Sequence, residues 1–487
     1  MNGLGDITLG SLHIMLPELF LCASAMILLM YGVYCRAKAD GMNQFLALAV
    51  LAVTMFLAVC HKVEPTHVMN GMFVTDAFAT FSKCLILGAA MLVLLFSSGW
   101  LREEGGRPFE FIILMLFATL GMMFMISAAD FLTLYVGLEM ASLSLYVLAS
   151  FQRDHAKSSE AGLKYFVLGA LASGMLLFGI SLIYGFTGTT GFESLAALFG
   201  AGGEVPKAVI VGLIFVMVGF CFKLSAAPFH MWAPDVYEGA PTPVTAFFAT
   251  APKVAAFALF TRVLLQPFGE LFNQWQQVII FAAIASMLVG ALAAIMQTNI
   301  KRLLAYSSIG HVGFIFMAIA SGSAEGVQAM LIYLALYIFM SAGAFGCVLA
   351  MKRAGQPVED IKSLAGLSQS QPFMAAFLAI FMFSMAGIPP LAGFFGKMYV
   401  VLAAVNAGLI WLAVLGVATS VIACYYYLKV VKVMYFDTPA KHFDSSHSFA
   451  YRVAMLLAVA VTTLFFFLPT PLVTHAKAAA DSLFVAP

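Results

Sequence analysis

Charged side chains are scarce in this sequence. Of its 487 residues, only 10% are Asp, Glu, Lys or Arg, whereas 63% are hydrophobic. A soluble domain of this size needs more charge than that to cover its surface. Many apolar stretches also reach the length of about 20 residues that a helix needs to cross the hydrocarbon core of a bilayer. The composition therefore excludes an ordinary soluble protein and predicts a polytopic membrane protein.

Several binding motifs are also missing. The 7 cysteines are scattered without a CxxC pair, which argues against an iron–sulfur site, a zinc site or a disulfide framework. Neither GxGxxG nor GxxxxGK[ST] occurs, so no nucleotide site is indicated. The net charge of +1, without a Lys/Arg block, gives no reason to expect nucleic acid as a partner. We expect no cofactor and no metal in this chain, and any redox cofactor would belong to a partner.

Hydropathy predicts an all-α bundle of about 14 transmembrane helices with short linkers and no substantial soluble domain. The expected spans are 11–34, 43–60, 76–98, 108–127, 130–151, 159–185, 206–229, 241–265, 275–296, 301–320, 327–351, 372–405, 408–434 and 450–472.

Basic residues give the expected orientation of these spans. With the N-terminus outside, the inner loops and their flanks hold Arg36, Lys38, Arg102, Arg107, Arg153, Lys157, Lys301, Arg302, Lys352, Arg353, Lys362 and Lys441. The outer loops and their flanks hold only Lys62, Lys207, Arg262 and Lys477. Because cytoplasmic loops carry the excess of Lys and Arg, we expect both termini on the outer side.

Two of the expected spans contain helix breakers. The seventh span has Pro228 shortly after Lys223, and the twelfth has Pro389 and Pro390 ahead of Lys397. A proline inside a helix removes a backbone donor and clashes with the preceding turn, so both helices should break or kink. The breaks lie five spans apart. Because this number is odd, the two broken spans cross the membrane in opposite directions. This predicts an inverted repeat, although the two halves share little sequence.

The repeat divides the single membrane domain, residues 1–487, into parts. The expected parts are an N-terminal group of three helices (1–107), a first repeat (108–265), an inverted second repeat (266–434), and a loop with the last helix (435–487).

Four ionisable residues fall inside the predicted spans. Glu139 lies about nine residues after Asp130, which is roughly 14 Å into its span. Lys223 lies beside the first break, Lys253 about twelve residues from the inner end of its span, and Lys397 past the second break. A protonated structural Glu and snorkelling lysines are the structural alternatives. Snorkelling suits Lys83, Lys429 and Lys432, which lie nearer to span ends.

The choice of lysine favours proton transfer. Each lysine at mid-membrane costs about 2.5–3.5 kcal/mol, so a fold without a use for three of them should lose them. Burial and a nearby carboxylate shift the proton affinity of a lysine in opposite directions, so such a group loads and releases protons as its surroundings change. An arginine stays protonated. We therefore interpret Glu139, Lys223, Lys253 and Lys397 as stations of a proton path.

Two histidines are weaker candidates for the same path. His230 follows the first break and would link Lys223 to the inner side. His311 lies near mid-depth in the tenth span and would bridge the two halves. A lone buried histidine is more often a hydrogen-bonded core residue, and the wide separation of these two argues against a metal site.

The motifs around these residues resemble the antiporter-like membrane subunits of respiratory complex I, the proton-pumping NADH:quinone oxidoreductase. The similarity rests on LYVGLEMASLSLYVL, FKLSAAPFHMWAPDVYEGAPTPVTAF and GIPPLAGFFGK, and it extends over nearly the whole chain. LPELFL, PKVAAFALF and TNIKRLLAYSSIGHVGF resemble the subunit N branch in particular. Lys397 also fits that branch, because subunit M usually carries a glutamate there, and no long C-terminal extension like that of subunit L follows.

This resemblance implies roles for the four residues. Glu139 and Lys223 correspond to the Glu–Lys pair of the family, Lys253 to its central lysine and Lys397 to its terminal lysine. It also implies a bacterial inner-membrane subunit without redox chemistry of its own, with neighbouring antiporter-like and small membrane subunits as partners. NADH, FMN, iron–sulfur clusters and quinone are then expected on those partner subunits. The alternatives are a cation/proton antiporter subunit and a purely structural membrane subunit.

Overall fold

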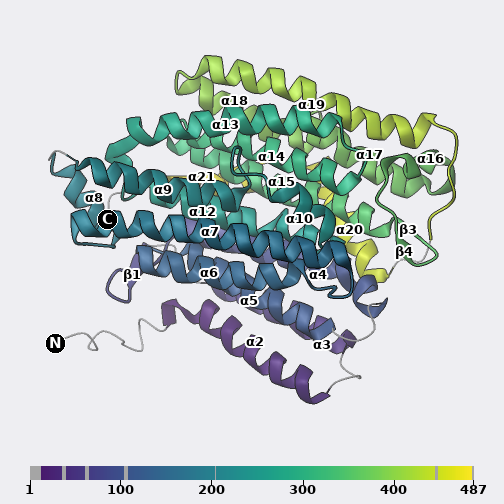
Figure 1. Cartoon of the computed structure of the whole chain (residues 1–487), viewed down its shortest axis with the longest axis horizontal. Coiled ribbons are helices and arrows are strands. Elements are labelled where there is room, and N and C mark those ends of the chain that lie inside the picture. Colours follow the sequence, from purple (N-terminus) through teal and green to yellow (C-terminus); the bar gives the residue numbers. More distant parts are fainter. Residues whose placement is uncertain are drawn as a thin grey trace.

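A computed structural model describes residues 13–35, 40–60, 65–103, 108–202, 205–444 and 448–484. Its helices run nearly parallel to one another, and strands are confined to two short hairpins (Figure 1). Twelve helices in the described ranges are long and apolar enough to cross a membrane. The broken α17–α18 pair and α20 are shorter apolar helices, and with them the predicted set of about fourteen spans is confirmed.

The bounds of the elements follow the predicted spans closely. The first half contains α2 (Leu16–Cys35), α3 (Asp40–Cys60), β1 (Thr66–Val68), β2 (Phe73–Thr75), α4 (Ala77–Glu103), α5 (Pro108–Ile126), α6 (Phe131–Ala149), α7 (Ala156–Thr187), α8 (Phe192–Gly200), α9 (Lys207–Leu224), α10 (Ala233–Gly239), α11 (Thr242–Phe248) and α12 (Ala251–Leu265). The second half contains η2 (Gly269–Leu271), α13 (Phe272–Ile295), α14 (Ile300–Ile319), α15 (Ala324–Ala350), β3 (Lys352–Arg353), β4 (Gln356–Pro357), η3 (Ile361–Leu364), α16 (Leu367–Ser370), α17 (Pro372–Ala386), α18 (Ala392–Asn406), α19 (Ile410–Phe436), α20 (Phe449–Leu464) and α21 (Thr470–Asp481).

Both predicted breaks are present. α9 ends at Leu224, and Ser225 takes a left-handed conformation with φ of 56° before the chain resumes as α10. α17 ends at Ala386, and Gly387 caps it in the same left-handed region with φ of 90°. Each break also contains a cis X-Pro peptide, at Pro228 and Pro390. The last carbonyls of each half-helix therefore lack an intrahelical partner at the depth of the break.

The eighth span is interrupted as well, which corrects the expectation of one continuous helix over 241–265. α11 ends at Phe248, and α12 starts at Ala251 with Pro252 in its first turn. Ala249 and Thr250 lie between the two helices, and Thr250 has φ of −118° and ψ of −93°. A proline is favoured in the first turn of a helix because its nitrogen needs no partner there, so Pro252 marks the start of a new helix. This interruption lies just before Lys253.

Lys83 does not snorkel, contrary to the expectation from its place in the sequence. Its Nζ lies 2.6 Å from Oε1 of Glu18, and both side chains are buried. The pair joins α4 to α2, so the lysine is held inside by a carboxylate that also lies within a span. Arg262, expected near an outer flank, is likewise buried and lies 2.8 Å from Asp76. Lys432 is exposed and pairs with Asp437, as snorkelling predicts.

Candidate functional site

Lys223 lies in the last turn of α9, directly before the break. Its Nζ donates to Ser142 Oγ at 2.8 Å and to Tyr146 OH at 3.0 Å, and both acceptors belong to α6. The ammonium also lies 5.4 Å from the centre of the Tyr146 ring. These neutral groups solvate the charge of the lysine without forming an ion pair with it.

Glu139 approaches Lys223 without forming an ion pair within 4.0 Å in the described structure. It is half-buried on α6, one turn before Ser142, and its Oε1 is buried without a hydrogen-bond partner. The two charges are near enough to interact electrostatically. The structure thus places the predicted pair within electrostatic reach and without direct contact.

Lys253 belongs to the eighth span and contacts the residues at the first break. Its side chain is 3% exposed, and its Nζ donates to Ser225 Oγ at 3.1 Å and to the Leu224 carbonyl at 3.4 Å. The last carbonyl of the half-helix α9 therefore accepts from a buried ammonium. This arrangement satisfies part of the backbone that the break exposes.

Lys397 has the same relation to the second break. Its Nζ donates to the carbonyl of Ala386, the last residue of α17, at 3.0 Å, and to Ser420 Oγ of α19 at 2.7 Å. The ring of Phe314 lies 5.1 Å from the ammonium. Each broken helix thus ends on a carbonyl that a buried lysine caps.

His311 lies between these two lysines. Both of their charges act on its ring, and the ring is 4% exposed in α14. Its Nδ1 lies 2.6 Å from Tyr333 OH of α15, and its Nε2 lies 3.2 Å from Tyr427 OH of α19. Tyr427 in turn hydrogen-bonds Ser307. A ring with hydroxyl groups on both nitrogens has the geometry of a proton relay.

His230 has a different environment. It is half-buried between α9 and α10, and its Nδ1 is buried without a partner. No hydrogen bond joins it to Lys223 in the described structure. The structure therefore leaves His230 apart from the other five candidates.

The hydroxyl groups that connect the stations were not predicted. They are Ser142, Tyr146, Ser225, Ser307, Tyr333, Ser420 and Tyr427. One signal was available, because Glu139, Ser142 and Tyr146 recur at helical spacing and share a face of α6. The others come from spans distant in sequence, so only the packing brings them together.

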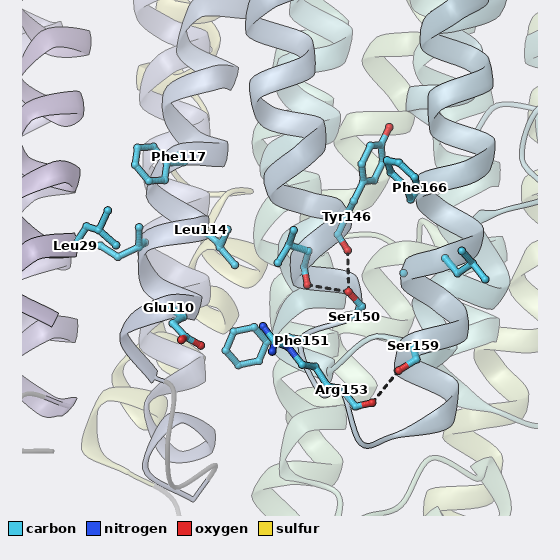
Figure 2. Close-up of a pocket in the computed structure, with 14 residues that line it drawn as sticks. Leu29, Glu110, Leu114, Phe117, Tyr146, Ser150, Phe151, Arg153, Ser159 and Phe166 are labelled. Atoms are coloured by element: carbon cyan, nitrogen blue, oxygen red, sulfur yellow. Dashed lines mark hydrogen bonds between the residues drawn. The ribbon is translucent and has the colours of Figure 1, made fainter. Parts of the chain in front are cut away.

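A groove of about 780 Å³ opens beside the Lys223 end of the site. Leu29, Phe117 and Phe166 supply apolar walls, and Glu110 and Arg153 lie toward one end (Figure 2). Tyr146, which accepts from Lys223, also lines the groove. The mostly apolar walls suit a lateral contact with lipid or protein rather than a water-filled channel.

An ion-pair network covers the end of the bundle near α10. Arg302 donates to Asp235 at 2.6 Å and to Glu238 at 3.1 Å, and Lys157 and Lys164 reach the same two carboxylates. Burial alone would raise the pKa of Asp235 and of Glu238, but the hydrogen bonds from these basic groups outweigh it and lower both pKa values. Both carboxylates therefore stay ionised at neutral pH.

The network adjoins a polar cavity of about 570 Å³, lined by Glu238, Ala240, Asn299, Lys301 and Glu359 among others. Lys301 is 2% exposed and donates to the carbonyls of Glu238 and Ala240 and to Glu359.

Among the described residues, no group of three or more His, Cys, Asp or Glu side chains could hold a metal ion.

Interrupted helices, buried lysines at their ends and a histidine bonded to two tyrosines between them define a membrane protein of the antiporter-like class. Residues 128–423 match the family described as NADH:quinone oxidoreductase/Mrp antiporter, TM. NADH-quinone oxidoreductase subunit N of Rhodospirillum rubrum is 54% identical over 96% of this chain and 96% of that protein. The chain belongs to the NADH-quinone oxidoreductase subunit N family.

Solved structures agree with this assignment. A chain of respiratory complex I from Thermus thermophilus with bound aureothin is 32% identical, with a TM-score of 0.82, and the match covers 95% of this chain and 99% of that one. A chain of the Mrp complex from Dietzia sp. has a TM-score of 0.84 at 22% identity, covering 97% of this chain and 98% of that chain, and shows the same fold.

Proposed function

We propose that this chain translocates protons across the membrane as a subunit of an NADH:quinone oxidoreductase. The observation that carries the proposal is the paired arrangement of Lys253 and Lys397, each donating to the last carbonyl of a broken half-helix, with His311 between them. Ionisable groups at this depth are costly, and such groups in membrane proteins mark ion and proton pathways.

The path begins at Lys223, and the nearby carboxylate of Glu139 interacts with its charge. From there the proton passes to Lys253 at the first break, then to His311 and on to Lys397 at the second break. Tyr333 and Tyr427 hold the His311 ring, so the hydroxyl groups orient the relay. Hydration of the two breaks would complete the steps between stations.

The free energy for transport comes from quinone reduction in partner subunits. NADH, FMN, iron–sulfur clusters and quinone belong to those partners, in line with the name that the relatives carry. Partners also include neighbouring antiporter-like and small membrane subunits. This chain performs no redox chemistry, and its part in the enzyme is that of a translocase.

The protein resides in a bacterial inner membrane with both termini on the periplasmic side. The excess of Lys and Arg near the loops of the opposite end supports this orientation. The polar cavity then faces the cytoplasm, and protons move from the cytoplasm to the periplasm.

The two breaks support the division into a first repeat (108–265) and an inverted second repeat (266–434). Each half has a half-helix that ends in a left-handed residue, and each such end accepts from a buried lysine. Residues 1–107 and 435–487 flank the repeats.

Replacement of Lys223 and, separately, Lys397 with Ala tests the function. We expect assembled complex in both variants, together with a large loss of proton pumping in membrane vesicles. Lys432→Ala is the matched control, because this lysine is exposed and pairs with Asp437 away from the breaks. Wild-type assembly, redox turnover and pumping in both variants would refute the proton path, and sodium-dependent transport would favour a cation/proton antiporter instead.

A further inference from the structure

Two opposite charges stand at one end of the groove of about 780 Å³. Glu110 lies in the first turn of α5, and Arg153 lies between α6 and α7. Figure 2 shows both side chains at the same end of the groove, with Phe117 and Phe166 toward the other end. Among the described residues, neither charged group forms an ion pair within 4.0 Å. The groove therefore offers an unpaired carboxylate and an unpaired guanidinium to a ligand.

The depth of these charges matches that of lipid headgroups. α5 begins at Pro108 and α6 ends at Ala149, so both charged residues lie at the ends of spans. Phe117 follows Glu110 by about seven residues, which places it roughly 10 Å deeper in the membrane. The walls of the groove are mostly apolar, with Phe117, Phe166 and several leucines. Charges at a span end above apolar walls fit a headgroup with an acyl chain below it.

The pair of charges selects the kind of headgroup. The planar fork of Arg153 suits a phosphodiester, which it can bind through two hydrogen bonds. A primary ammonium has three N–H donors for the carboxylate of Glu110. A headgroup with negative charge alone would be repelled by Glu110, and a choline headgroup has no N–H to donate. The two residues together fit a zwitterionic phospholipid with a primary amine, such as phosphatidylethanolamine.

Tyr146 connects the groove to Lys223. It lines the groove, and its ring packs edge-on against Phe166 with 5.8 Å between the centroids. Its hydroxyl lies 3.0 Å from Lys223 Nζ. The same hydroxyl sits close to the backbone of α7, since a Cβ on Gly169 would lie 2.2 Å from it. The position of this hydroxyl therefore depends on how α6 and α7 pack beside the groove.

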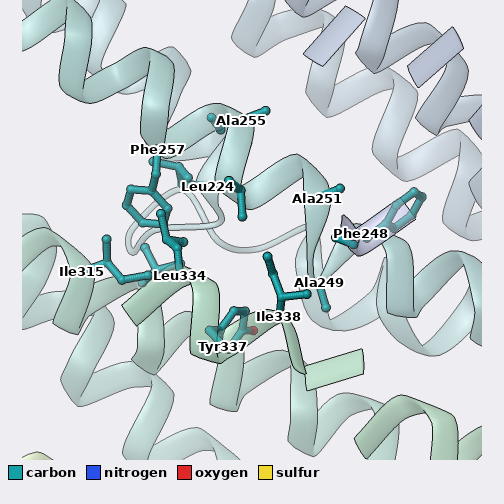
Figure 3. Close-up of a cluster of buried hydrophobic side chains, with 14 of the residues drawn as sticks. Leu224, Phe248, Ala249, Ala251, Ala255, Phe257, Ile315, Leu334, Tyr337 and Ile338 are labelled. Atoms are coloured by element: carbon teal, nitrogen blue, oxygen red, sulfur yellow. The ribbon is translucent and has the colours of Figure 1, made fainter. Parts of the chain in front are cut away.

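The other side of the α9 end is fixed by the core. Leu224, which follows Lys223, lies with Phe257 and Leu334 in the buried apolar cluster drawn in Figure 3. All three side chains are fully buried. Both side-chain partners of Lys223 come from α6 instead. The α6 side is thus the side of Lys223 that the contents of the groove can change.

We propose that the groove binds one phospholipid with a primary-amine headgroup, its phosphate on Arg153, its ammonium on Glu110 and an acyl chain along the apolar walls. The bound lipid keeps α6 and α7 packed so that Tyr146 stays in place to solvate the Lys223 ammonium. The effect on Lys223 rests on the proposed function, whereas the binding of the lipid does not.

Lipid retained by the assembled complex tests the binding. The complex is reconstituted into vesicles of equal parts phosphatidylethanolamine, phosphatidylcholine and phosphatidylglycerol and purified again in detergent, and its lipids are counted by mass spectrometry. We expect Arg153→Gln to lose one phosphatidylethanolamine per complex. Glu110→Gln should lose the preference for phosphatidylethanolamine over phosphatidylglycerol, because the partner of the phosphate remains and the repulsion of an anionic headgroup is gone.

Lys432→Gln is the matched control. It also removes a charge near the end of a span, but this lysine is exposed and pairs with Asp437, and it does not line the groove. We expect this variant to retain the same lipids as the unmodified complex.

Proton pumping in two kinds of vesicle tests the link to Lys223. We expect the unmodified complex to pump several-fold faster in vesicles that contain phosphatidylethanolamine than in vesicles of phosphatidylcholine and phosphatidylglycerol alone. Arg153→Gln should pump at the slower rate in both, and Lys432→Gln should respond to the lipid as the unmodified complex does.

The outcomes separate the lipid site from the proposed function. Unchanged lipid retention in Arg153→Gln and Glu110→Gln would refute the lipid site and leave the proton path standing. Loss of a partner subunit with the lipid retained would assign the groove to a protein and refute the site as well. Loss of the lipid with unchanged pumping would keep the site and overturn its link to Lys223. Wild-type pumping in Lys223→Ala would instead refute the proposed function, whatever the lipid result.

Discussion

Lys253 donates to Ser225, the residue at which the first half-helix turns into its break, across 3.1 Å. The same ammonium reaches the Leu224 carbonyl, and Lys397 repeats the contact at Ala386. A protonated lysine therefore stabilises the end of each broken helix, and a neutral one would leave that carbonyl without its charged donor. Protonation and the local structure of the break are linked in this way at both sites.

His311→Gln should slow proton pumping several-fold while leaving the amount of assembled complex near normal. An amide side chain can hydrogen-bond Tyr333 and Tyr427, but it neither takes up nor releases a proton at pH 7. Pumping in membrane vesicles, measured per NADH oxidised, checks this.

His230→Gln serves as the comparison, because no hydrogen bond joins His230 to the described stations. We expect a much smaller effect from it. A larger loss of pumping in His230→Gln than in His311→Gln would reverse the ranking of the two histidines.

Gly137→Val should destabilise the packing of α5 against α6. A Cβ at this position would lie 2.9 Å from the Met125 backbone nitrogen, and a valine adds two further methyl groups. Overpacking of this kind costs about 1–3 kcal/mol. Gly174→Val makes the same change where a Cβ meets nothing within 4 Å. The unfolding midpoint should fall in the first variant only, and equal midpoints would contradict the packing argument.

The ion pairs of Asp235 and Glu238 should stabilise the protein at neutral pH and not in acid. The pKa values of both carboxyls are lowered in the folded chain, so their contribution is present above the ordinary value of about 4 and is lost as the pH falls through the lowered values. Because the pairs are partly exposed, Arg302→Gln should cost about 1 kcal/mol or less at pH 7.

Melting temperatures of the purified protein with and without Arg302→Gln check this at two pH values. The difference should appear at pH 7 and shrink toward zero in acid below the lowered pKa values. A difference of the same size at both pH values would show that packing of the Arg302 side chain, rather than its charge, matters.

Most of the fold was predictable because the bilayer constrains the sequence strongly. The lengths of the apolar stretches predicted the helices. The prolines of the seventh and twelfth spans predicted both breaks. The interruption before Lys253 was missed because apolar residues continue through it, although Pro252 marks the new helix. α21 was missed because its Ala-rich sequence is weakly apolar.

The candidate site was predictable only in part. Mid-span charges stand out in an apolar sequence, so Glu139 and the three lysines could be named. Their partners could not, since Ser225, Ser420 and Tyr427 are ordinary helix residues whose role depends on which spans meet. Lys83 looked like a snorkelling lysine because its partner Glu18 lies 65 positions away in another span.

The most direct test of the proton path is Lys253→Arg, measured as proton pumping in vesicles that carry the assembled complex. Arginine keeps the charge that caps Leu224 but does not release a proton, whereas Lys253→Met removes the charge altogether. Lys429→Arg is the control, since among the described residues that half-buried lysine donates to the Ile295 carbonyl alone, at 3.4 Å. The proton path predicts that pumping is lost in both Lys253 variants and kept in Lys429→Arg. Wild-type pumping with arginine at position 253 would show that only the charge is needed there and would contradict the path.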